Sequence, residues 1–348
     1  MNFNISDFRK NIICENTPVD SVVETVVNGD TLELYLTATN DKVKFIELEW
    51  AFASGDGIYV LGDAWERSYG ELEFKKLADN DRPMPWYFIA TNRAECFCFG
   101  VKTQPNAFIS FRYTVDGIKA LIDCRNGSHG VELGGRKLHV ATFVYKKYNS
   151  DNIFANLHDY CKTLCENPIL PKERVYGGNN WYYAYGKSSY GEIVTDARVQ
   201  AELAKGIDNK PFEVIDDCWQ INSCEGPWLP NEKFGDMKKL ADEIRANGAR
   251  PGIWVRLLHN RDSAITDDMR LERAGKKKYL DPTHPAVKEF IRADIERIKG
   301  WGYKLIKHDF SSFDIFGKWG FAMLDNELPE TNRSFKDRTK TTAEIIKV

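Results

Sequence analysis

Two short segments of the sequence carry charged side chains that could take part in catalysis. Lys307 and Asp309 flank His308, and Asp216 lies next to Asp217. On a β-strand, Lys307 and Asp309 would face the same side, because side chains alternate along a strand. A neighbouring cation favours an ionised carboxylate, which a nucleophile requires. Asp309 is therefore the candidate nucleophile, although a surface ion pair at a strand end would explain the same residues.

The adjacent Asp216 and Asp217 suit the binding of neighbouring sugar hydroxyls, because carboxylates accept charge-assisted hydrogen bonds. A capping role or metal ligation by this pair of aspartates is the alternative. Neither a His-x-His pair nor a third clustered carboxylate accompanies the pair, so no metal site is expected. Arg256 could contact a ligand or hold Asp216 or Asp217 in place, and the sequence does not separate these roles.

Tryptophans near these segments could offer apolar faces to a sugar ring. They are Trp181, Trp219 and Trp254. Aromatic side chains line sugar-binding clefts, but large hydrophobic cores use them as well. Ligand binding and core packing therefore remain equal interpretations of the three residues.

The elements that must position these residues alternate between strands and helices. Strand candidates end near Asn180, Asp217, Arg256 and Asp309. One helix should begin at a capping box on Ser189, a second should end at Gly248, and a third should run from Pro285 to Gly300. Such alternation predicts a parallel sheet. We expect residues 174–348 to form about four strand–helix units, the first half of a (β/α)8 TIM barrel, whose complete form needs roughly 250 residues.

The earlier part of the chain has the pattern of antiparallel β-structure. Leu32, Leu34 and Leu36 alternate with polar residues, and Asn28-Gly29 and Asn126-Gly127 are turn signals. Residues 1–166 are expected to form a β-sandwich that ends in a helix with Phe154, Leu157, Cys161 and Leu164 on one face. Residues 167–173 contain two prolines and should form a linker. The predicted fold class is α+β, with two domains.

Composition excludes several classes of protein. The net charge is −3, so no basic field points to nucleic acid. The sequence contains no run of 18 apolar residues, so no membrane span is expected, and no signal peptide is evident. The eight cysteines do not form a disulfide framework, and we interpret most as reduced core residues. A cytoplasmic location is expected.

The segments around the aspartates resemble motifs of glycoside hydrolase family 36, the melibiase-like α-galactosidases. Residues 211–220 resemble a barrel strand in which an Asp-Asp-x-Trp motif grips galactose, and residues 307–310 resemble the Lys-aromatic-Asp motif that carries the nucleophile. Segments 227–234 and 248–254 look like the same family, and residues 62–67 are similar to its N-terminal sandwich. His308 departs from the aromatic or aliphatic residue that is usual there.

This resemblance implies a retaining glycoside hydrolase that cleaves terminal α-galactosides through a covalent glycosyl-Asp intermediate, with Asp309 as the nucleophile. The sugar-binding residues it implies are Lys307, Asp216, Asp217, Trp181 and Trp254. No cofactor is implied, because the two-carboxylate reaction needs none. The expected partner is an α-galactoside oligosaccharide or glycoside, and family members often form homo-oligomers.

A retaining glycosidase also needs an acid/base carboxyl about 5–5.5 Å from the nucleophile. Asp314, Glu327 and Glu330 do not match the family's acid motif, which follows a later barrel strand. We therefore expect the acid/base beyond Val348, and we expect these residues to be a fragment of a longer enzyme that is inactive or poorly folded alone.

Other functions fit the same motifs. A galactosyl transglycosidase similar to raffinose synthases would use the same nucleophile with a sugar acceptor. A hydrolase specific for α-N-acetylgalactosamine also remains open. From another class, a non-catalytic sugar-binding protein with a decayed barrel is an alternative, although the presence of both Lys307 and Asp309 argues against decay.

Overall fold

The computed structural model describes residues 3–66, 72–80, 82–149, 152–273, 276–323 and 328–347. Arg67 and Glu327, both singled out from the sequence, lie outside these ranges. The chain divides into two compact units. Unit 1 comprises Met1–Pro168, Glu272–Ala274 and Ile315–Val348, and unit 2 comprises Ile169–Leu271 and Gly275–Asp314. The division near Pro168 falls within the stretch expected as a linker, whereas residues 315–348 were expected in the second domain.

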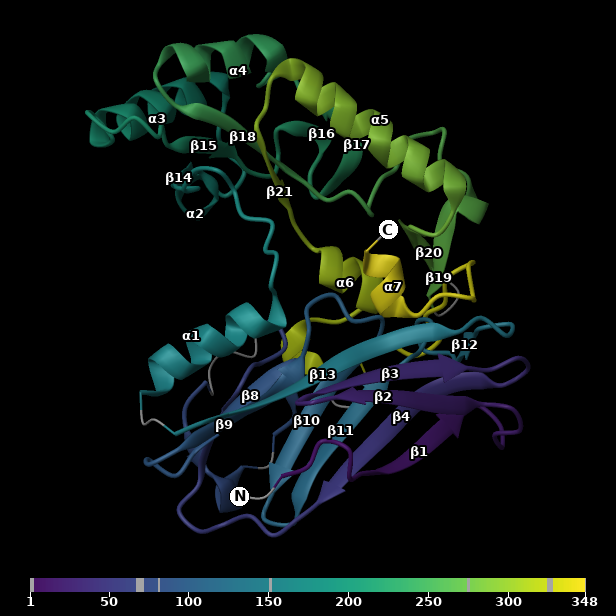
Figure 1. The fold of residues 1–348 in the computed structure, drawn as a ribbon. Helices are drawn as coiled ribbons and strands as arrows, with labels where there is room; N and C mark the ends of the chain where they lie inside the picture. Colours follow the sequence, from purple (N-terminus) through teal and green to yellow (C-terminus); the bar gives the residue numbers. More distant parts are fainter. Residues whose placement is uncertain are drawn as a thin grey trace. The chain divides into compact units, whose positions relative to one another are not determined.

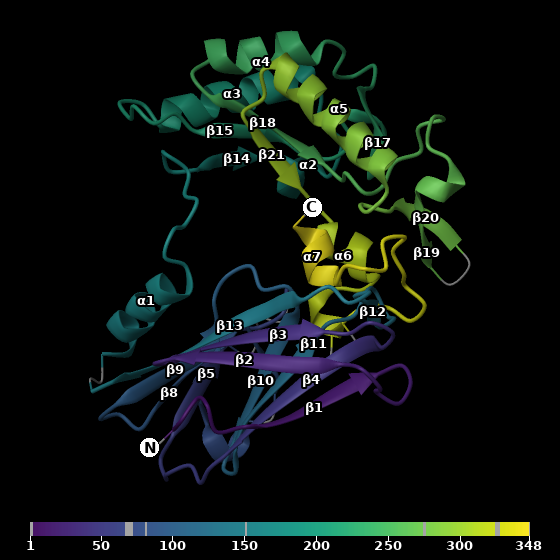
Figure 2. The same ribbon diagram turned by 45° about the vertical axis from the view of Figure 1, so that its right-hand side comes forward.

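The described strands of unit 1 form two antiparallel sheets (Figures 1 and 2). The first has the order β1 (Arg9–Cys14), β4 (Lys42–Ala51), β11 (Gly117–Asp123), β10 (Phe108–Thr114) and β7 (Met84–Pro85), with β12 (Val131–Glu132) paired to β4. The second has the order β2 (Val22–Asn28), β3 (Thr31–Thr37), β13 (Leu138–Tyr148), β9 (Cys96–Val101), β8 (Tyr87–Thr91), β5 (Tyr59–Gly62) and β6 (Lys75–Lys76).

Alternation along the strands supplies the core between these two sheets. Leu32 and Leu34 of β3 are fully buried in the same cluster as Ile46 and Leu48 of β4. Strand β3 buries every second side chain because its pleat turns successive residues to opposite faces. The predicted antiparallel strands are thus confirmed, and their apolar residues face the interior.

The helix predicted before the linker is present as α1 (Ile153–Leu164), but only Leu157 and Leu164 of the predicted face pack against the sandwich. Phe154 is 85% exposed, whereas Asn156, Tyr160 and Leu164 are buried. The Tyr160 hydroxyl donates to the carbonyl of Val144 at 2.8 Å. Polar partners in the neighbouring sheet therefore rotate the helix away from the face that hydrophobicity alone indicated.

Residues near the end of the chain belong to unit 1 because they bond to one of its turns. The Asn126 Nδ2 donates to the carbonyls of Asp337 and Lys340, each at 2.8 Å. The backbone N–H of Gly127 donates to the Thr342 hydroxyl at 2.8 Å, at the start of α7 (Thr342–Ile346). The Asn126-Gly127 turn thus bonds to residues near the end of the chain. The turn was predicted only as a break between strands, and those residues were expected in the barrel.

Unit 2 contains a four-stranded parallel sheet with its strands in chain order, and its helices cover one face (Figures 1 and 2). The strands are β14 (Gly177–Asn179), β15 (Phe212–Ile215), β18 (Arg250–Val255) and β21 (Leu305–His308). The helices between them are α3 (Tyr190–Leu203), α4 (Met237–Ala246) and α5 (Pro285–Trp301). The predicted parallel sheet is confirmed. Helix α5 ends at Gly302, whose φ is +100°, and not at the predicted Gly300.

Shorter elements complete the described chain. They are α2 (Trp181–Ala184), β16 (Gln220–Asn222), β17 (Glu225–Pro230), β19 (Arg270–Arg273), β20 (Lys276–Leu280), α6 (Ser311–Phe316) and the 3₁₀ turns Leu77–Asp79, Asp267–Met269 and Gly320–Ala322. Within the described ranges, each helix is too short or too polar to cross a membrane.

Strand β15 carries a buried acid, Glu213, that makes folding stability depend on pH. Burial, together with the Asp196 carboxylate, raises the pKa of Glu213 to about 8. Between pH 4.5 and 8 the folded chain therefore holds a proton that the unfolded chain releases. This contribution to stability is complete below pH 4.5 and is lost as pH rises, by up to about 1.4 kcal/mol per pH unit.

We expect Glu213→Gln to remove this slope, because the amide does not titrate. Urea unfolding at pH 5 and pH 8 should show the variant gaining stability relative to wild type as pH rises. Glu232→Gln, at an exposed position, is the matched control and should leave the slope unchanged. Parallel pH curves for wild type and Glu213→Gln would contradict the assignment.

Candidate active site

The four parallel strands bring most of the predicted site residues to one edge of the sheet. Strands β15 and β21 lead directly into Asp216 and Asp309, and β18 carries Trp254 near its end. The strands pair in parallel register, with Trp254 opposite Lys307. Because parallel strands end at the same edge, residues distant in sequence become neighbours there.

Lys307 and Asp216 form a close ion pair at this edge. The Lys307 Nζ lies 2.5 Å from Asp216 Oδ2, and the Asn179 Nδ2 donates to the same oxygen at 2.6 Å. The Asp216 side chain is only 2% exposed, and its backbone N–H donates to Asn180 Oδ1 at 2.7 Å. An ammonium and an amide thus stabilise a buried carboxylate in one fixed position.

Asp309 is held from two sides yet remains accessible. The Trp254 Nε1 donates to Asp309 Oδ2 at 3.0 Å, and the Lys307 Nζ lies 3.9 Å from that oxygen. The other oxygen, Oδ1, accepts from the backbone N–H of Phe310 at 2.9 Å. Its side chain is 34% exposed, far more than that of Asp216. An oriented and accessible carboxylate is chemically suited to nucleophilic attack.

Asp217 accepts its hydrogen bonds from the loop that follows it. Its oxygens accept from Gln220 Nε2 at 2.6 Å, Ser223 Oγ at 3.0 Å, and both the backbone N–H and the Sγ of Cys224. Burial acts to raise the pKa of Asp217, but these hydrogen bonds, led by those from Cys224, leave it below its ordinary value. In the structure, Asp217 therefore stabilises the β16–β17 hairpin.

The three predicted tryptophans have different environments. Trp219 is fully buried in the core of unit 2, where its Nε1 donates to the Trp254 carbonyl at 2.8 Å. Trp254 is also buried and contacts Asp309 through its indole N–H. Trp181 is half-buried on α2, with its ring against Tyr185 at 5.9 Å. Of the three, Trp181 alone presents a partly exposed ring.

Arg256 has a structural partner that the sequence analysis did not assign to it. Its Nε and Nη2 donate to the carboxylate of Asp314, with an Nη2–Oδ1 distance of 2.5 Å. The guanidinium also lies over the Phe310 ring, 4.2 Å from its centroid. Both members of the pair are buried. Arg256 thus secures the segment after Asp309, and neither Asp216 nor Asp217 is its partner in these hydrogen bonds.

Sequence reasoning placed Asn180 at a strand end without giving it a role, and it missed Asn179; the side chains of both bond to Asp216. Their position at a strand end was a usable signal, since it matches that of Asp216 and Asp309. The roles of Asp314 and Cys224 had no comparable signal, because loop geometry brings them to Arg256 and Asp217.

A hollow of about 420 Å³ lies on this part of unit 2, lined by Asn179, Tyr182, Val214, Leu305 and Lys307 among others. Two of these lining residues, Asn179 and Lys307, bond to Asp216, whereas Asp216 and Asp309 are not themselves among the lining residues. In the part of the chain that the structure describes, no three His, Cys, Asp or Glu side chains gather as metal ligands. The hollow can accept a small polar molecule against an ammonium, an amide and an aromatic ring.

Comparisons of the sequence with protein-family models and with curated proteins give no match. Comparison of the structure with solved structures does give matches. TtGalA, an α-galactosidase from Thermus thermophilus solved with stachyose, superposes with a TM-score of 0.54 at 16% identity, covering 85% of this chain and 68% of its own. AgaB, a GH36 α-galactosidase from Geobacillus stearothermophilus, gives 0.56 at 16% identity, covering 87% and 52%.

The galactosidase domain of AgaSK, an α-galactosidase–sucrose kinase, gives a TM-score of 0.52 at 16% identity and covers 98% of this chain and 56% of its own. The chain thus spans between about half and two thirds of the length of these proteins. Its fold is that of the α-galactosidases. More particularly, it is a GH36-like fold, and the resemblance drawn from the sequence motifs is confirmed at that level.

Proposed function

We propose that the chain carries the nucleophile side of a retaining glycoside hydrolase that acts on terminal α-galactosides. In this proposal its four strand–helix units are the first half of a (β/α)8 barrel. The observation that carries it is the arrangement of Asp309, which is accessible, hydrogen-bonded by Trp254 and 3.9 Å from the Lys307 ammonium. Asp216, itself buried, shares that ammonium and holds it beside Asp309.

The reaction proceeds in two displacements. A carboxylate oxygen of Asp309 attacks the anomeric carbon, and the bond to the leaving group breaks with its electron pair, forming a galactosyl ester. Water then attacks the same carbon and releases Asp309. Trp254 and Lys307 keep Asp309 oriented between turnovers, while Lys307 and Asn179, both bonded to Asp216, hold the ring hydroxyls.

The substrate class is supported by two kinds of observation. Carboxylates and an ammonium beside a half-exposed Trp181 suit a sugar ring, which has hydroxyls on its edge and an apolar face. Structural neighbours have been solved with stachyose, raffinose and p-nitrophenyl α-D-galactopyranoside. We therefore assign the α-galactosides as the substrate class of this site.

The proton donor for the leaving group is a separate requirement. Asp314 follows Asp309 closely, but it is fully buried and bonded to Arg256, so it cannot protonate a departing sugar. A test of the nucleophile should therefore use a leaving group that needs little protonation, such as 2,4-dinitrophenolate.

The proposal is tested by following 2,4-dinitrophenyl α-D-galactopyranoside with the chain by proton NMR. Retention predicts that α-galactose appears first and later equilibrates to the β anomer. First appearance of β-galactose would overturn the double-displacement mechanism. Galactose binding without any release would instead support a non-catalytic sugar-binding protein, and galactosylation of added sucrose would identify a transglycosidase.

Trp254→Phe should slow this release about tenfold to a hundredfold, because the change removes one hydrogen bond to a charged group while keeping an aromatic ring. The affinity for galactose, measured by calorimetry, should change much less, since the indole contacts Asp309. An equal loss of rate and binding affinity would contradict this positioning role. Trp301→Phe, at a partly buried position on α5, is the matched control.

A further inference from the structure

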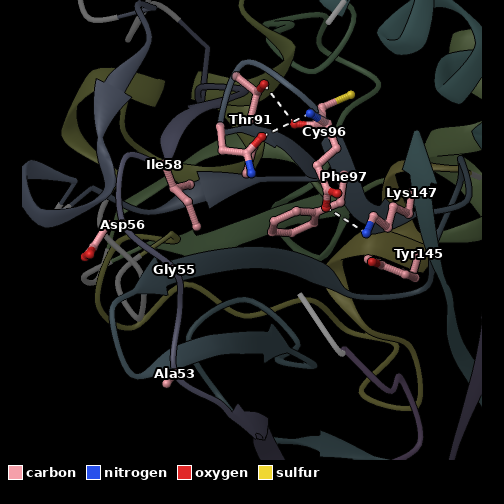
Figure 3. Close-up of a pocket in the computed structure, with 12 residues that line it drawn as sticks. Ala53, Gly55, Asp56, Ile58, Thr91, Cys96, Phe97, Tyr145 and Lys147 are labelled. Carbon is pink, nitrogen blue, oxygen red and sulfur yellow. Dashed lines mark hydrogen bonds and ion pairs between the residues drawn. The ribbon is translucent and has the colours of Figure 1, made fainter. Parts of the chain in front are cut away.

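Unit 1 contains a separate pocket of about 270 Å³ at one end of the sandwich. It lies where the loop after β4, the β8–β9 hairpin and the end of β13 come together (Figure 3). We call it the sandwich pocket and define it by Asp56, Asn92, Glu95, Phe97, Tyr145 and Lys147. Its residues take no part in the proposed active site.

The base of the sandwich pocket is aromatic. Phe97 belongs to the buried core of the sandwich, and Tyr145 packs against that core while remaining half-exposed. Their ring centroids are 6.0 Å apart with an interplanar angle of 45°. Burial raises the pKa of Tyr145 to about 12, so its hydroxyl stays a hydrogen-bond donor at neutral pH. The base therefore offers apolar ring surface and one fixed donor.

The rim of the sandwich pocket carries charges of both signs. The Lys147 Nζ lies 2.7 Å from Glu95 Oε2, and both side chains are 36% exposed. The hydrogen bond from Lys147 lowers the pKa of Glu95, which stays ionised. Asp56 is exposed on the opposite loop. Two carboxylates against one ammonium leave the rim net negative, which disfavours anionic ligands.

The hairpin that bears Asn92 and Glu95 is held in shape by its own side chains. Asn92 Oδ1 accepts from the backbone N–H groups of Ala94 and Glu95, each at 3.0 Å. The Thr91 hydroxyl donates to the Glu95 carbonyl at 3.0 Å. These bonds fix the rim before any ligand arrives, which lowers the entropic cost of binding.

We propose that the sandwich pocket binds the terminal hexose ring of a neutral saccharide. Hydroxyls of such a ring donate to Asp56 and Glu95 and accept from Lys147, while its C–H face lies on Phe97 and Tyr145. The volume suits a single ring, because pockets for larger ligands measure roughly 300–1,000 Å³. An ancillary site of this kind would hold a saccharide on unit 1 independently of the reaction.

The test separates this pocket from the active site by using the full chain with Asp216→Asn and Lys307→Met, which removes both members of the active-site ion pair. Saturation-transfer NMR is recorded with methyl α-D-galactopyranoside and with methyl α-D-glucopyranoside. We expect transfer to at least one of them, and the preferred sugar identifies the hexose. Because no turnover is needed, failure of the proposed hydrolase function leaves this result intact.

Gly55→Trp in the same background should reduce the transfer signal about tenfold by filling the pocket. Gly55 lines the pocket, and a Cβ there meets no atom within 4 Å, so the backbone at this position leaves room for a side chain. Gly300→Trp, on α5 and equally unobstructed, is the control. Lys147→Met should also weaken binding about tenfold. No transfer from either sugar, or transfer that survives Gly55→Trp, would overturn the proposal.

Discussion

Replacing Asp309 with asparagine is expected to reduce the release of 2,4-dinitrophenolate from its α-galactoside by at least about a thousandfold. The amide keeps the shape of the side chain but cannot form the galactosyl ester, so the first displacement is lost. Galactose affinity should change far less, because Lys307 and Asn179 still hold the ring. Stopped-flow absorbance gives the rate, and calorimetry gives the affinity.

Asp208→Asn provides the control for this experiment, since Asp208 is an exposed aspartate of the same unit. It should leave both rate and affinity at their wild-type values. If Asp309→Asn retained more than about a tenth of the rate, Asp309 would not be the nucleophile. A second variant tests the same assignment independently: external azide should rescue Asp309→Ala and form β-galactosyl azide, because azide then attacks from the face that the carboxylate occupied.

Of the substitutions proposed, Arg256→Met should lower the free energy of unfolding most, by about 3–5 kcal/mol. Asp314 is fully buried and accepts hydrogen bonds from two nitrogens of this guanidinium. Removing the cation leaves a buried carboxylate without its partner, and this costs more than the ion pair itself contributes. Urea unfolding followed by tryptophan fluorescence measures the loss.

Two further variants make this prediction specific. The double variant Arg256→Met/Asp314→Leu should recover much of the lost stability, because no uncompensated charge remains. Arg198→Met, at an exposed position on α3, should change the free energy of unfolding by less than about 0.5 kcal/mol. A double variant no more stable than Arg256→Met alone would show that packing, and not charge, explains the loss.

The regular patterns of the sequence predicted the elements well. Leu32, Leu34 and Leu36 alternate in the sequence and are fully buried in the structure. The alternation of strands and helices predicted the parallel sheet. The positions of Asp216 and Asp309 directly after its strands predicted that the two residues lie close together. These predictions succeed because a strand's two-residue period and the shared direction of parallel strands are local rules.

What the sequence did not reveal depends on contacts between distant segments. Tyr160 turns α1 by bonding to Val144, although Phe154 looked more suited to burial. Asp217 looked equivalent to Asp216, but the β16–β17 hairpin supplies its hydrogen-bond donors. The return of the chain's last residues to Asn126 likewise has no periodic signal. The hydrophobic pattern predicted the buried residues of β3, whereas polar partners set the orientation of α1 and the environment of Asp217.

The most direct measurement is intact-protein mass spectrometry after incubation with 2-deoxy-2-fluoro-α-D-galactosyl fluoride. Fluoride is a good leaving group, and the 2-fluoro substituent slows the second displacement, so the ester should accumulate. We predict one added fluorogalactosyl group, which peptide mapping assigns to Asp309 and which Asp309→Asn abolishes. An adduct on another residue, or none under conditions where galactose binds, would contradict a nucleophilic Asp309.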